Sequence, residues 1–244
     1  MNSQFRGALK LAQALKQRPT QAGFTLLESL VAIVAITFVT VSITPPIFIS
    51  VATRFQSQKA EQASYLAQGQ VDKVRVIVER GGKFKEEPEK YLPAQAGVSA
   101  TQIVNAPAPS SAANYLDSSN NNCNPKYDGE QIPATQALPV DINGDCEIDF
   151  YVQVFRSQNV TSGPGQNTET LGSVTYPASF VMGVRVYGVA AKAGFGSLST
   201  KPSDLLFTSG EGSMRTRPLA VLYTTVAQGD FIRSFDRIDG LQNQ

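Results

Sequence analysis

The chain has 244 residues, 42% of them hydrophobic, and a formal net charge of +1. This length and composition fit one ordinary domain with accessory segments and a packed core. The sequence contains no histidine and only two cysteines, so it cannot build a closed Cys/His zinc site, and it lacks the commonest general base. We therefore expect no enzymatic activity and no required cofactor. Lys and Arg are dispersed along the chain, which gives no support for nucleic-acid binding.

The N-terminal segment is first basic and then strongly apolar. Residues 1–23 hold four bases and no acid, whereas residues 24–53 contain a single charge, Glu28. As a helix the apolar segment would be about 45 Å long, and the hydrocarbon core of a bilayer is about 30 Å thick. The bases precede the apolar segment, so the pattern predicts a transmembrane helix with a cytoplasmic leader and an extracytoplasmic C-terminal part.

The layout differs from that of an ordinary secretory signal peptide. In such a signal the cleavage site follows the apolar core, but here the candidate processing residue, Gly23, precedes it. An ionised side chain within an apolar span is costly and normally has a partner. Glu28 therefore requires a cation from outside the span.

The run Gly23-Phe24-Thr25-Leu26-Leu27-Glu28 resembles the prepilin processing motif of the type IV pilin/pseudopilin family, and the apolar segment extends the resemblance. The resemblance implies that a prepilin peptidase cuts after Gly23 and methylates the new amine of Phe24. It also implies that Glu28 pairs with the Phe24 amine of a neighbouring subunit during assembly.

The resemblance further implies a function, partners and a location. We expect a minor pilin or pseudopilin that assembles through its N-terminal helix into a type IV pilus or a type II secretion-like pseudopilus and supports motility, secretion or adhesion. Its partners would be other pilin or pseudopilin subunits, the prepilin peptidase and the inner-membrane assembly platform. It would lie in the inner membrane as a single-pass protein before it enters the fibre. The mature length of 221 residues (244 minus 23) favours a minor subunit, because major pilins are commonly shorter.

Two alternative functions stay open at this point. One is a fibre-tip or surface module that binds polysaccharide, DNA or a secreted substrate. The other is a plain membrane-anchored extracytoplasmic protein in which the motif is fortuitous.

Pro45 and Pro46 interrupt the apolar segment. Pro45 falls at mature position 22, where many pilins also have a proline. A proline pair removes two backbone donors, so we expect a kink or a local break in the helix here.

Residues 54–82 show a different pattern. Apolar residues recur at steps of three and four with polar residues between them, which predicts an amphipathic helix that ends at Gly81-Gly82. The apolar stripe is formed by Ala63, Leu66, Ala67, Val71, Val74 and Val78. The simplest interpretation is one long helix whose second half packs this stripe on the globular domain.

Residues 83–140 are rich in Pro, Ala, Ser and Asn, so regular structure there should be short or absent and the segment should act as a connector. Residues 141–244 should form the sheet. The ranges 148–156, 180–189 and 219–226 are β-branched and aromatic and predict strands. Residues 205–208 and 174–176 are weaker candidates, the latter pairing near Phe180, and the residues after Asp230 look like a surface tail. The expected fold is α+β, with the helix covering one face of an antiparallel sheet.

Cys123 and Cys146 are the two cysteines, and they enclose 22 residues. An even pair in an exported domain predicts a disulfide. On the loop-closure model this bridge would stabilise the domain by about 3 kcal/mol.

The segment from Asp141 to Asp149 is a candidate calcium loop. Oxygen-bearing side chains at alternating positions can converge on a hard cation, and the start of the segment resembles EF-hand-like and dockerin-type loops. The candidate ligands are Asp141, Asn143, Asp145 and Asp149. The segment departs from that pattern at Cys146, which replaces the usual glycine, and at Val152, where an acid is expected. The alternative is an Asn-Gly turn with solvated acids before a strand.

Overall fold

A computed structural model describes residues 25–203 and 213–229. The candidate strand at residues 205–208, the tail after Asp230, and both Gly23 and Phe24 lie outside the described residues. The chain divides into two compact units, residues 1–52 and 53–244. The long helix α2 (Leu26–Arg80) contributes to both units, and each unit is described by itself.

In the first unit, α2 contains an exposed apolar stretch. Its stretch Leu26–Ile43 is long and apolar enough to cross a membrane, and none of that stretch is buried. The expected local break at the proline pair is wrong, because α2 continues across Pro45 and Pro46. The expected kink stays a prediction. Each proline removes one backbone donor, but its fixed φ is compatible with helix, and hydrogen bonds on both sides of the pair can hold the helix together.

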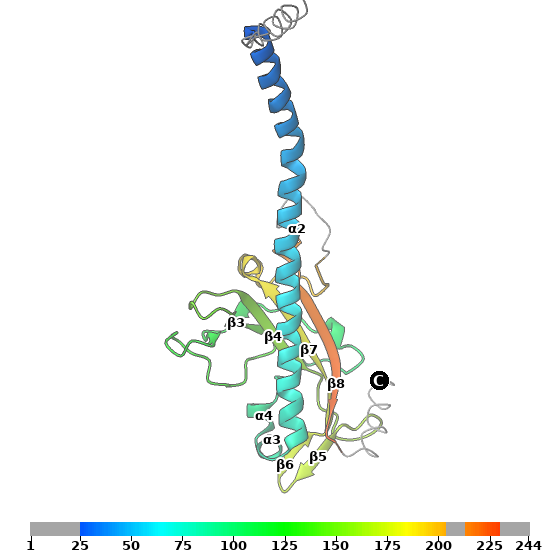
Figure 1. Ribbon diagram of the computed structural model, residues 1–244. Helices are drawn as coiled ribbons and strands as arrows, with labels where there is room; N and C mark the ends of the chain where they lie inside the picture. The colour runs from blue at the N-terminus through cyan, green and yellow to red at the C-terminus, as the bar shows by residue number, and fades with distance from the viewer. Residues whose placement is uncertain (1–24, 204–212, 230–244) are drawn as a thin grey trace, which may run out of the picture. The chain divides into compact units, whose positions relative to one another are not determined.

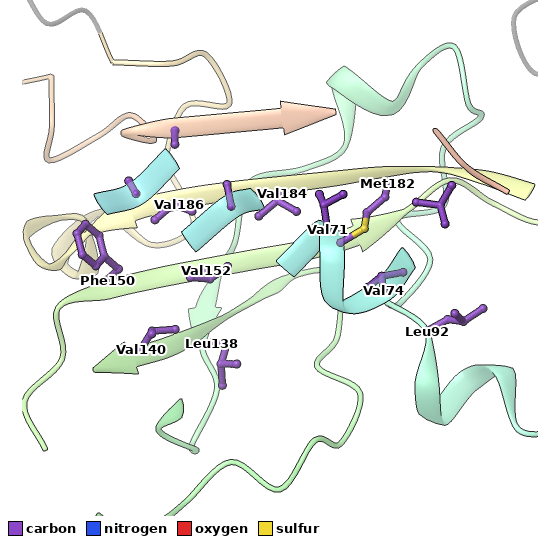
Figure 2. Packing of buried hydrophobic residues seen from close by; sticks show 14 of the residues in the cluster. Val71, Val74, Leu92, Leu138, Val140, Phe150, Val152, Met182, Val184 and Val186 are labelled. Carbon is purple, nitrogen blue, oxygen red and sulfur yellow. The ribbon is translucent and has the colours of Figure 1, made fainter. Parts of the chain in front are cut away.

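In the second unit, the stripe on α2 forms part of the main core, as predicted. Five of its six residues are buried and Leu66 packs against them at the margin. Helix α2 ends where Gly81 and Gly82 take positive φ angles of 65° and 87°, a conformation that glycine adopts without steric cost. Figure 1 shows the second half of α2 crossing one face of the sheet, and Figure 2 shows Val71 and Val74 packed over the strands.

The main sheet has the order β1-β3-β4-β7-β8, with β2 also paired to β3. Its strands are β1 (Ser111–Ala112), β2 (Asp117–Ser118), β3 (Gln136–Asp141), β4 (Phe150–Arg156), β7 (Ser179–Gly188) and β8 (Ala220–Ala227). The strands predicted at residues 148–156, 180–189 and 219–226 correspond to β4, β7 and β8. The α+β class is confirmed, but the sheet is mixed rather than antiparallel, since β1 and β2 both run parallel to β3.

The predicted boundary between the connector and the sheet region, placed between residues 140 and 141, is wrong by one strand. The connector contains the short helices α3 (Lys83–Glu86), α4 (Pro88–Tyr91) and η1 (Ile103–Asn105), as well as β1 and β2, and it ends in strand β3 of the main sheet. Pro139 lies inside β3. It stands between residues 136–137, which pair with β1, and residues 140–141, which pair with β2. A strand tolerates proline where no neighbouring strand needs its missing N–H.

A separate two-stranded sheet joins β5 (Thr168–Leu171) to β6 (Val174–Pro177). The expectation that residues 174–176 pair near Phe180 is therefore wrong. Leu171 pairs with Val174 across Gly172 and Ser173, and Gly172 has a φ of 61°. Gly-Ser is a favoured two-residue hairpin loop, so local turn geometry fixes this pairing.

The second face of the main sheet is covered by the connector. Ala94, Ile103, Ala106 and Ala134 pack around Phe155, and Tyr151 and Tyr187 pack with residues of η2 (Val189–Gly194) and the loop that follows it. The second unit therefore has three layers, in the order α2, sheet and connector.

Candidate functional site

The first residues of α2 form a helix cap. The backbone N–H of Glu28 donates to the Thr25 hydroxyl at 3.2 Å, and the N–H of Ser29 donates to the Thr25 carbonyl at 3.1 Å. Thr25 and Glu28 have the spacing of a capping box, and an acid in the first turn is favoured by the helix dipole. The sequence interpretation assigned Thr25 no role, although the Thr-x-x-Glu spacing signals this cap.

Glu28 lies on the exposed surface of α2, and within residues 25–203 and 213–229 no ion pair engages it. Gly23 and Phe24 precede the described part, so the predicted pairing of Glu28 with a Phe24 amine stays a prediction.

Three hydroxyl groups in the apolar stretch are bonded within the helix. Thr37, Thr40 and Ser42 each donate a hydrogen bond of 2.8 Å to the carbonyl four residues earlier. In a hydrocarbon environment each unsatisfied polar group is costly. Because these hydroxyl groups bond to the backbone of their own helix, they add little polar character to its surface, which suits membrane anchoring.

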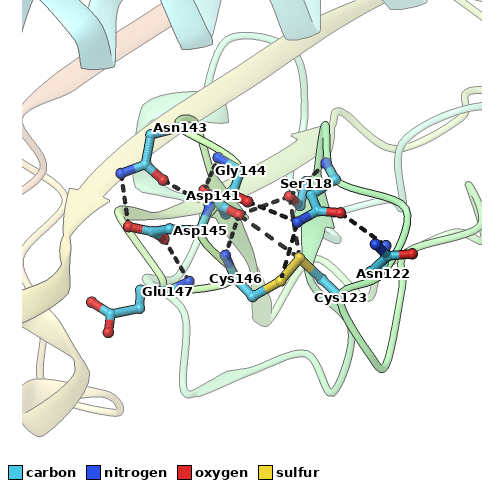
Figure 3. Close-up of a disulfide and its surroundings, with 10 residues drawn as sticks. Ser118, Asn122, Cys123, Asp141, Asn143, Gly144, Asp145, Cys146 and Glu147 are labelled. Carbon is cyan, nitrogen blue, oxygen red and sulfur yellow. Dashed lines mark hydrogen bonds between the residues drawn. A yellow bond between two sulfur atoms is a disulfide. The ribbon is translucent and has the colours of Figure 1, made fainter.

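The predicted disulfide between Cys123 and Cys146 is present, with Cα atoms 5.4 Å apart. It ties the connector to the loop between β3 and β4, as Figure 3 shows. The described residues place both sulfur atoms within 4.8 Å of a carboxylate oxygen of Asp141. Because metals bind thiolates and these sulfurs are joined to each other, that group offers no thiolate ligand.

Asp141 organises this loop. Its carboxylate accepts hydrogen bonds from the N–H of Gly144 at 2.7 Å, from the N–H of Cys146 at 2.9 Å and from the Ser118 hydroxyl at 2.7 Å. Cys146 takes a positive φ of 67°. Burial acts to raise the pKa of Asp141, but the hydrogen bonds from Ser118, Cys146 and Gly144 outweigh it and hold that pKa below its ordinary value.

The other candidate calcium ligands also accept hydrogen bonds inside the loop. Asp145 accepts from the side-chain amide of Asn143 at 2.9 Å and from the N–H of Glu147 at 2.8 Å. Asp149 accepts from the N–H of Ile142 at 3.0 Å and pairs with Lys59 of α2 at 3.4 Å. Asp141 is buried, so the solvated acids of the turn interpretation are wrong at this position, and calcium binding stays an untested hypothesis.

A groove of about 300 Å³ opens beside α2 in the second unit, and the sequence analysis did not anticipate it. Its floor is aliphatic, with Val74 and Ile77 from α2 and Leu138, Val152 and Val154 from the sheet. Its remaining walls come from Gln70 and Lys73 of α2 and from residues 90–93 and 127–132.

Two tyrosines line this groove, and each has a lysine ammonium over its ring. Lys73 lies 5.5 Å from the ring centre of Tyr127, and Lys90 lies 5.6 Å from that of Tyr91. The Tyr127 hydroxyl donates to the carbonyl of Glu130 at 2.7 Å. Burial, with the nearby charge of Asp117, Asp128 and Glu130, raises the pKa of Tyr127 to about 12. The groove can therefore receive an apolar group between polar walls, a common arrangement in binding sites.

Two arginines are fully buried, and sequence reasoning treated them only as strand residues. The guanidinium of Arg185 donates to the carbonyls of Val104, Ala106 and Pro107 at 2.9 to 3.2 Å. Arg156 donates to the carbonyl of Pro93 at 2.8 Å and pairs with Glu89 at 3.3 Å. Burial lowers the pKa of Arg156 to about 10, against the opposing effect of Glu89. Both arginines attach the irregular connector to the sheet.

Comparison with known families gives one match. The model of the prokaryotic N-terminal methylation motif matches residues 18–44, a range that contains Gly23, Phe24 and Glu28. No curated protein and no solved structure matches the chain.

Proposed function

We propose that this chain, which carries a prepilin-type N-terminal methylation motif and an apolar helix, is a minor pilin or pseudopilin. The motif and the helix support a type IV pilin-like or pseudopilin-like subunit that is anchored in a membrane, processed by a prepilin peptidase and assembled with other pilin subunits. The finer proposal is assembly into a type IV pilus or a type II secretion-like pseudopilus. In this role the protein is structural and supports motility, secretion or adhesion.

The observation that carries the proposal is the position of the methylation motif directly before the apolar helix. Cleavage after Gly23 removes the basic leader and keeps the whole apolar stretch. It also creates an amine at Phe24, which can supply the cation that Glu28 lacks in the described part of the chain. An intramembrane acid with no partner of its own is normally satisfied by a neighbouring group, and here that group is the Phe24 amine of the next subunit.

The location follows from the same features. The leader stays in the cytoplasm because its four bases precede the apolar stretch. The second unit, with its disulfide, then lies on the opposite side of the inner membrane, where disulfides persist. From there the subunit enters the fibre through contacts with the inner-membrane assembly platform.

Mass spectrometry of the protein from membranes of a host with a prepilin peptidase tests this proposal. We expect a mature chain that starts at Phe24 and carries one methyl group on its amine. A Gly23→Val variant is the matched control, because it removes the cleavage residue and should retain the leader. An unprocessed chain with Gly23 intact, or cleavage after the apolar stretch, would contradict the proposal.

A second test addresses Glu28. A Glu28→Gln variant keeps the size and the Thr25 cap but cannot form an ion pair. We expect normal cleavage after Gly23 and loss of the subunit from purified fibres. Equal incorporation of the variant and the parent chain into fibres would contradict the pairing role of Glu28.

The groove beside α2 favours a second candidate function, a surface module that binds polysaccharide, DNA or a secreted substrate. Its aliphatic floor and the rings of Tyr91 and Tyr127 support this candidate. Titration of the mature chain with defined oligosaccharides and single-stranded DNA is the test. Binding that a Tyr127→Ala variant loses would favour the module, whereas binding to neither probe would count against it for both ligand classes.

A further inference from the structure

Strand β8 is an edge of the main sheet. Among the residues that the structure describes, β8 pairs with β7 alone, whereas the opposite edge along β3 carries β1 and β2. The outer side of a β-strand edge presents a row of backbone N–H and C=O groups that can pair with another strand.

The hydrogen bonds of β7 show which residues of β8 turn their backbone outward. The N–H of Ser157 donates to the carbonyl of Val181 at 2.8 Å, and the N–H of Gln228 donates to the carbonyl of Ala178 at 2.9 Å. Backbone groups alternate between the two sides of an antiparallel strand. Odd-numbered residues of β7 therefore bond to β4, and even-numbered ones bond to even-numbered residues of β8.

By the same alternation, Val221, Tyr223 and Thr225 point their N–H and C=O groups away from β7. These three residues offer paired donors and acceptors about 7 Å apart, which is two residues of extended chain. Only another extended polypeptide repeats donors and acceptors at this spacing.

β8 lacks the features that usually protect a sheet edge. Its eight residues, AVLYTTVA, include no charge, no proline and no glycine. Natural edge strands are commonly short or carry lysine, proline or a bulge that prevents pairing. Within residues 25–203 and 213–229, this edge is long, uncharged and paired on one side only.

A groove of about 290 Å³ runs beside this edge, between β8 and α2. Leu222 and Thr224 line it from β8, and Val71 is among the residues that line it from α2. Arg75 donates to the Thr224 hydroxyl at 3.0 Å and pairs with Asp72 at 3.8 Å. The charges on the helix side compensate each other, so the groove suits an uncharged side chain. At about 30 Å³ for each water-sized group it has room for roughly ten non-hydrogen atoms.

We propose that the outer edge of β8 binds an extended segment of another polypeptide by strand addition, with an uncharged side chain of that segment in the groove beside α2. Main-chain hydrogen bonds to Val221, Tyr223 and Thr225 supply the affinity, and the groove selects the side chain, as in other cases of strand addition. The residues of this surface lie in the second unit and do not include the apolar stretch Leu26–Ile43, so the failure of this proposal and the failure of the proposed assembly role are separate outcomes.

The test uses a synthetic peptide with the sequence of β7, residues 179–188, because this sequence already forms an antiparallel pair with β8. The labelled peptide is titrated into the full mature chain in detergent micelles. Two further peptides carry N-methyl groups on alternate residues, one on the odd set and one on the even set. A strand that adds to β8 points the N–H groups of one set toward the edge. The peptide that is methylated on this set cannot donate those hydrogen bonds and should not bind, whereas the other methylated peptide should bind. Equal binding of both methylated peptides, or no binding of the parent peptide, would overturn the proposal.

Variants of Thr225 test the same edge from the protein side. Thr225→Pro removes an outward N–H and leaves the bonds to β7 in place, so peptide binding should weaken by about tenfold or more. Thr225→Val keeps the N–H and should bind like the parent chain. Unfolding curves of both variants report whether the fold is retained, and if Thr225→Pro does not fold, the methylated peptides decide the question alone.

Hydrogen exchange of the free protein adds an independent readout. The amides of Val221, Tyr223 and Thr225 should exchange faster than those of Leu222 and Thr224, and they should become protected when the peptide is added. Protection of the three outward amides before any peptide is added would mean that the chain's own residues cover the edge, and this would refute the proposal.

Discussion

The guanidinium of Arg185 lies over the ring of Phe155, 4.7 Å from its centre. Both side chains are fully buried between the sheet and the connector. The same guanidinium donates to the side-chain oxygen of Gln153 at 3.3 Å and to the Tyr223 hydroxyl at 3.1 Å. No carboxylate pairs with Arg185 within the described residues. Neutral oxygens and an aromatic ring therefore satisfy this buried charge.

We predict that Arg185→Met destabilises the protein by about 3 kcal/mol or more, because it leaves buried carbonyls without donors. Arg185→Lys should not restore stability, since an ammonium group cannot reproduce the planar set of five donors. Denaturant unfolding of the mature chain measures both variants. A loss below about 1 kcal/mol for Arg185→Met would show that the connector does not depend on these bonds.

A second prediction concerns Gly183, over which two aromatic rings pack closely. A Cβ atom added here would lie 2.5 Å from the ring of Phe155 and 3.1 Å from the ring of Tyr223. Gly183→Ala should therefore cost about 1–3 kcal/mol through overpacking. The control is Gly69→Ala in α2, where nothing lies within 4 Å of the new methyl group, and it should stabilise the protein by about 0.5–1 kcal/mol. Thermal unfolding of the two variants should shift in opposite directions.

The parts of the fold that follow from local periodicity could be predicted from the sequence. The stripe on α2 and the strands β4, β7 and β8 depend on spacings of three to four or of two residues, and these spacings are visible in one sequence. The hairpin of β5 and β6 also had a local signal, the Gly172-Ser173 turn.

The covering of the second sheet face could not be predicted in this way. It depends on contacts such as that of Arg185 with Ala106, which are 79 residues apart in the chain, and an irregular segment has no period that reveals its partner. At the candidate site, the disulfide followed from cysteine count, whereas the cap of α2 was missed although the Thr25 to Glu28 spacing signals it. The groove beside α2 had no such signal, because its walls come from five separate stretches of the chain.

The disulfide supports a third prediction. A Cys123→Ser, Cys146→Ser double variant should lose about 3 kcal/mol of stability, as loop closure predicts for a segment of this length. Reduction of the parent chain should give a similar loss in denaturant unfolding, while the double variant should not respond to reductant. Equal stability of the oxidised and reduced parent would show that the loop is held by its hydrogen bonds alone.

A fourth prediction separates calcium from the turn interpretation. In the described loop, Asn143 and Asp145 bond to each other and Asp149 pairs with Lys59, so we expect no heat and no rise in unfolding temperature when calcium reaches millimolar concentration. A bound ion would instead stabilise the folded state by linkage. Saturable heat that Asp145→Asn and Asp149→Asn both reduce would establish the calcium site.

The last prediction concerns the pH dependence contributed by Asp141. Its pKa is lower in the folded state than in the unfolded chain, so the unfolded state binds a proton more tightly. The resulting stabilisation is present above the unfolded value of about 3.9 and is lost as the pH falls through the lower folded value. An Asp141→Asn variant accepts hydrogen bonds at one atom only, so it should be less stable than the parent at neutral pH. The difference in free energy of unfolding between the parent and the variant should become smaller as the pH falls below about 4. A difference that stays constant from neutral to acidic pH would mean that the charge of the carboxylate contributes nothing to stability.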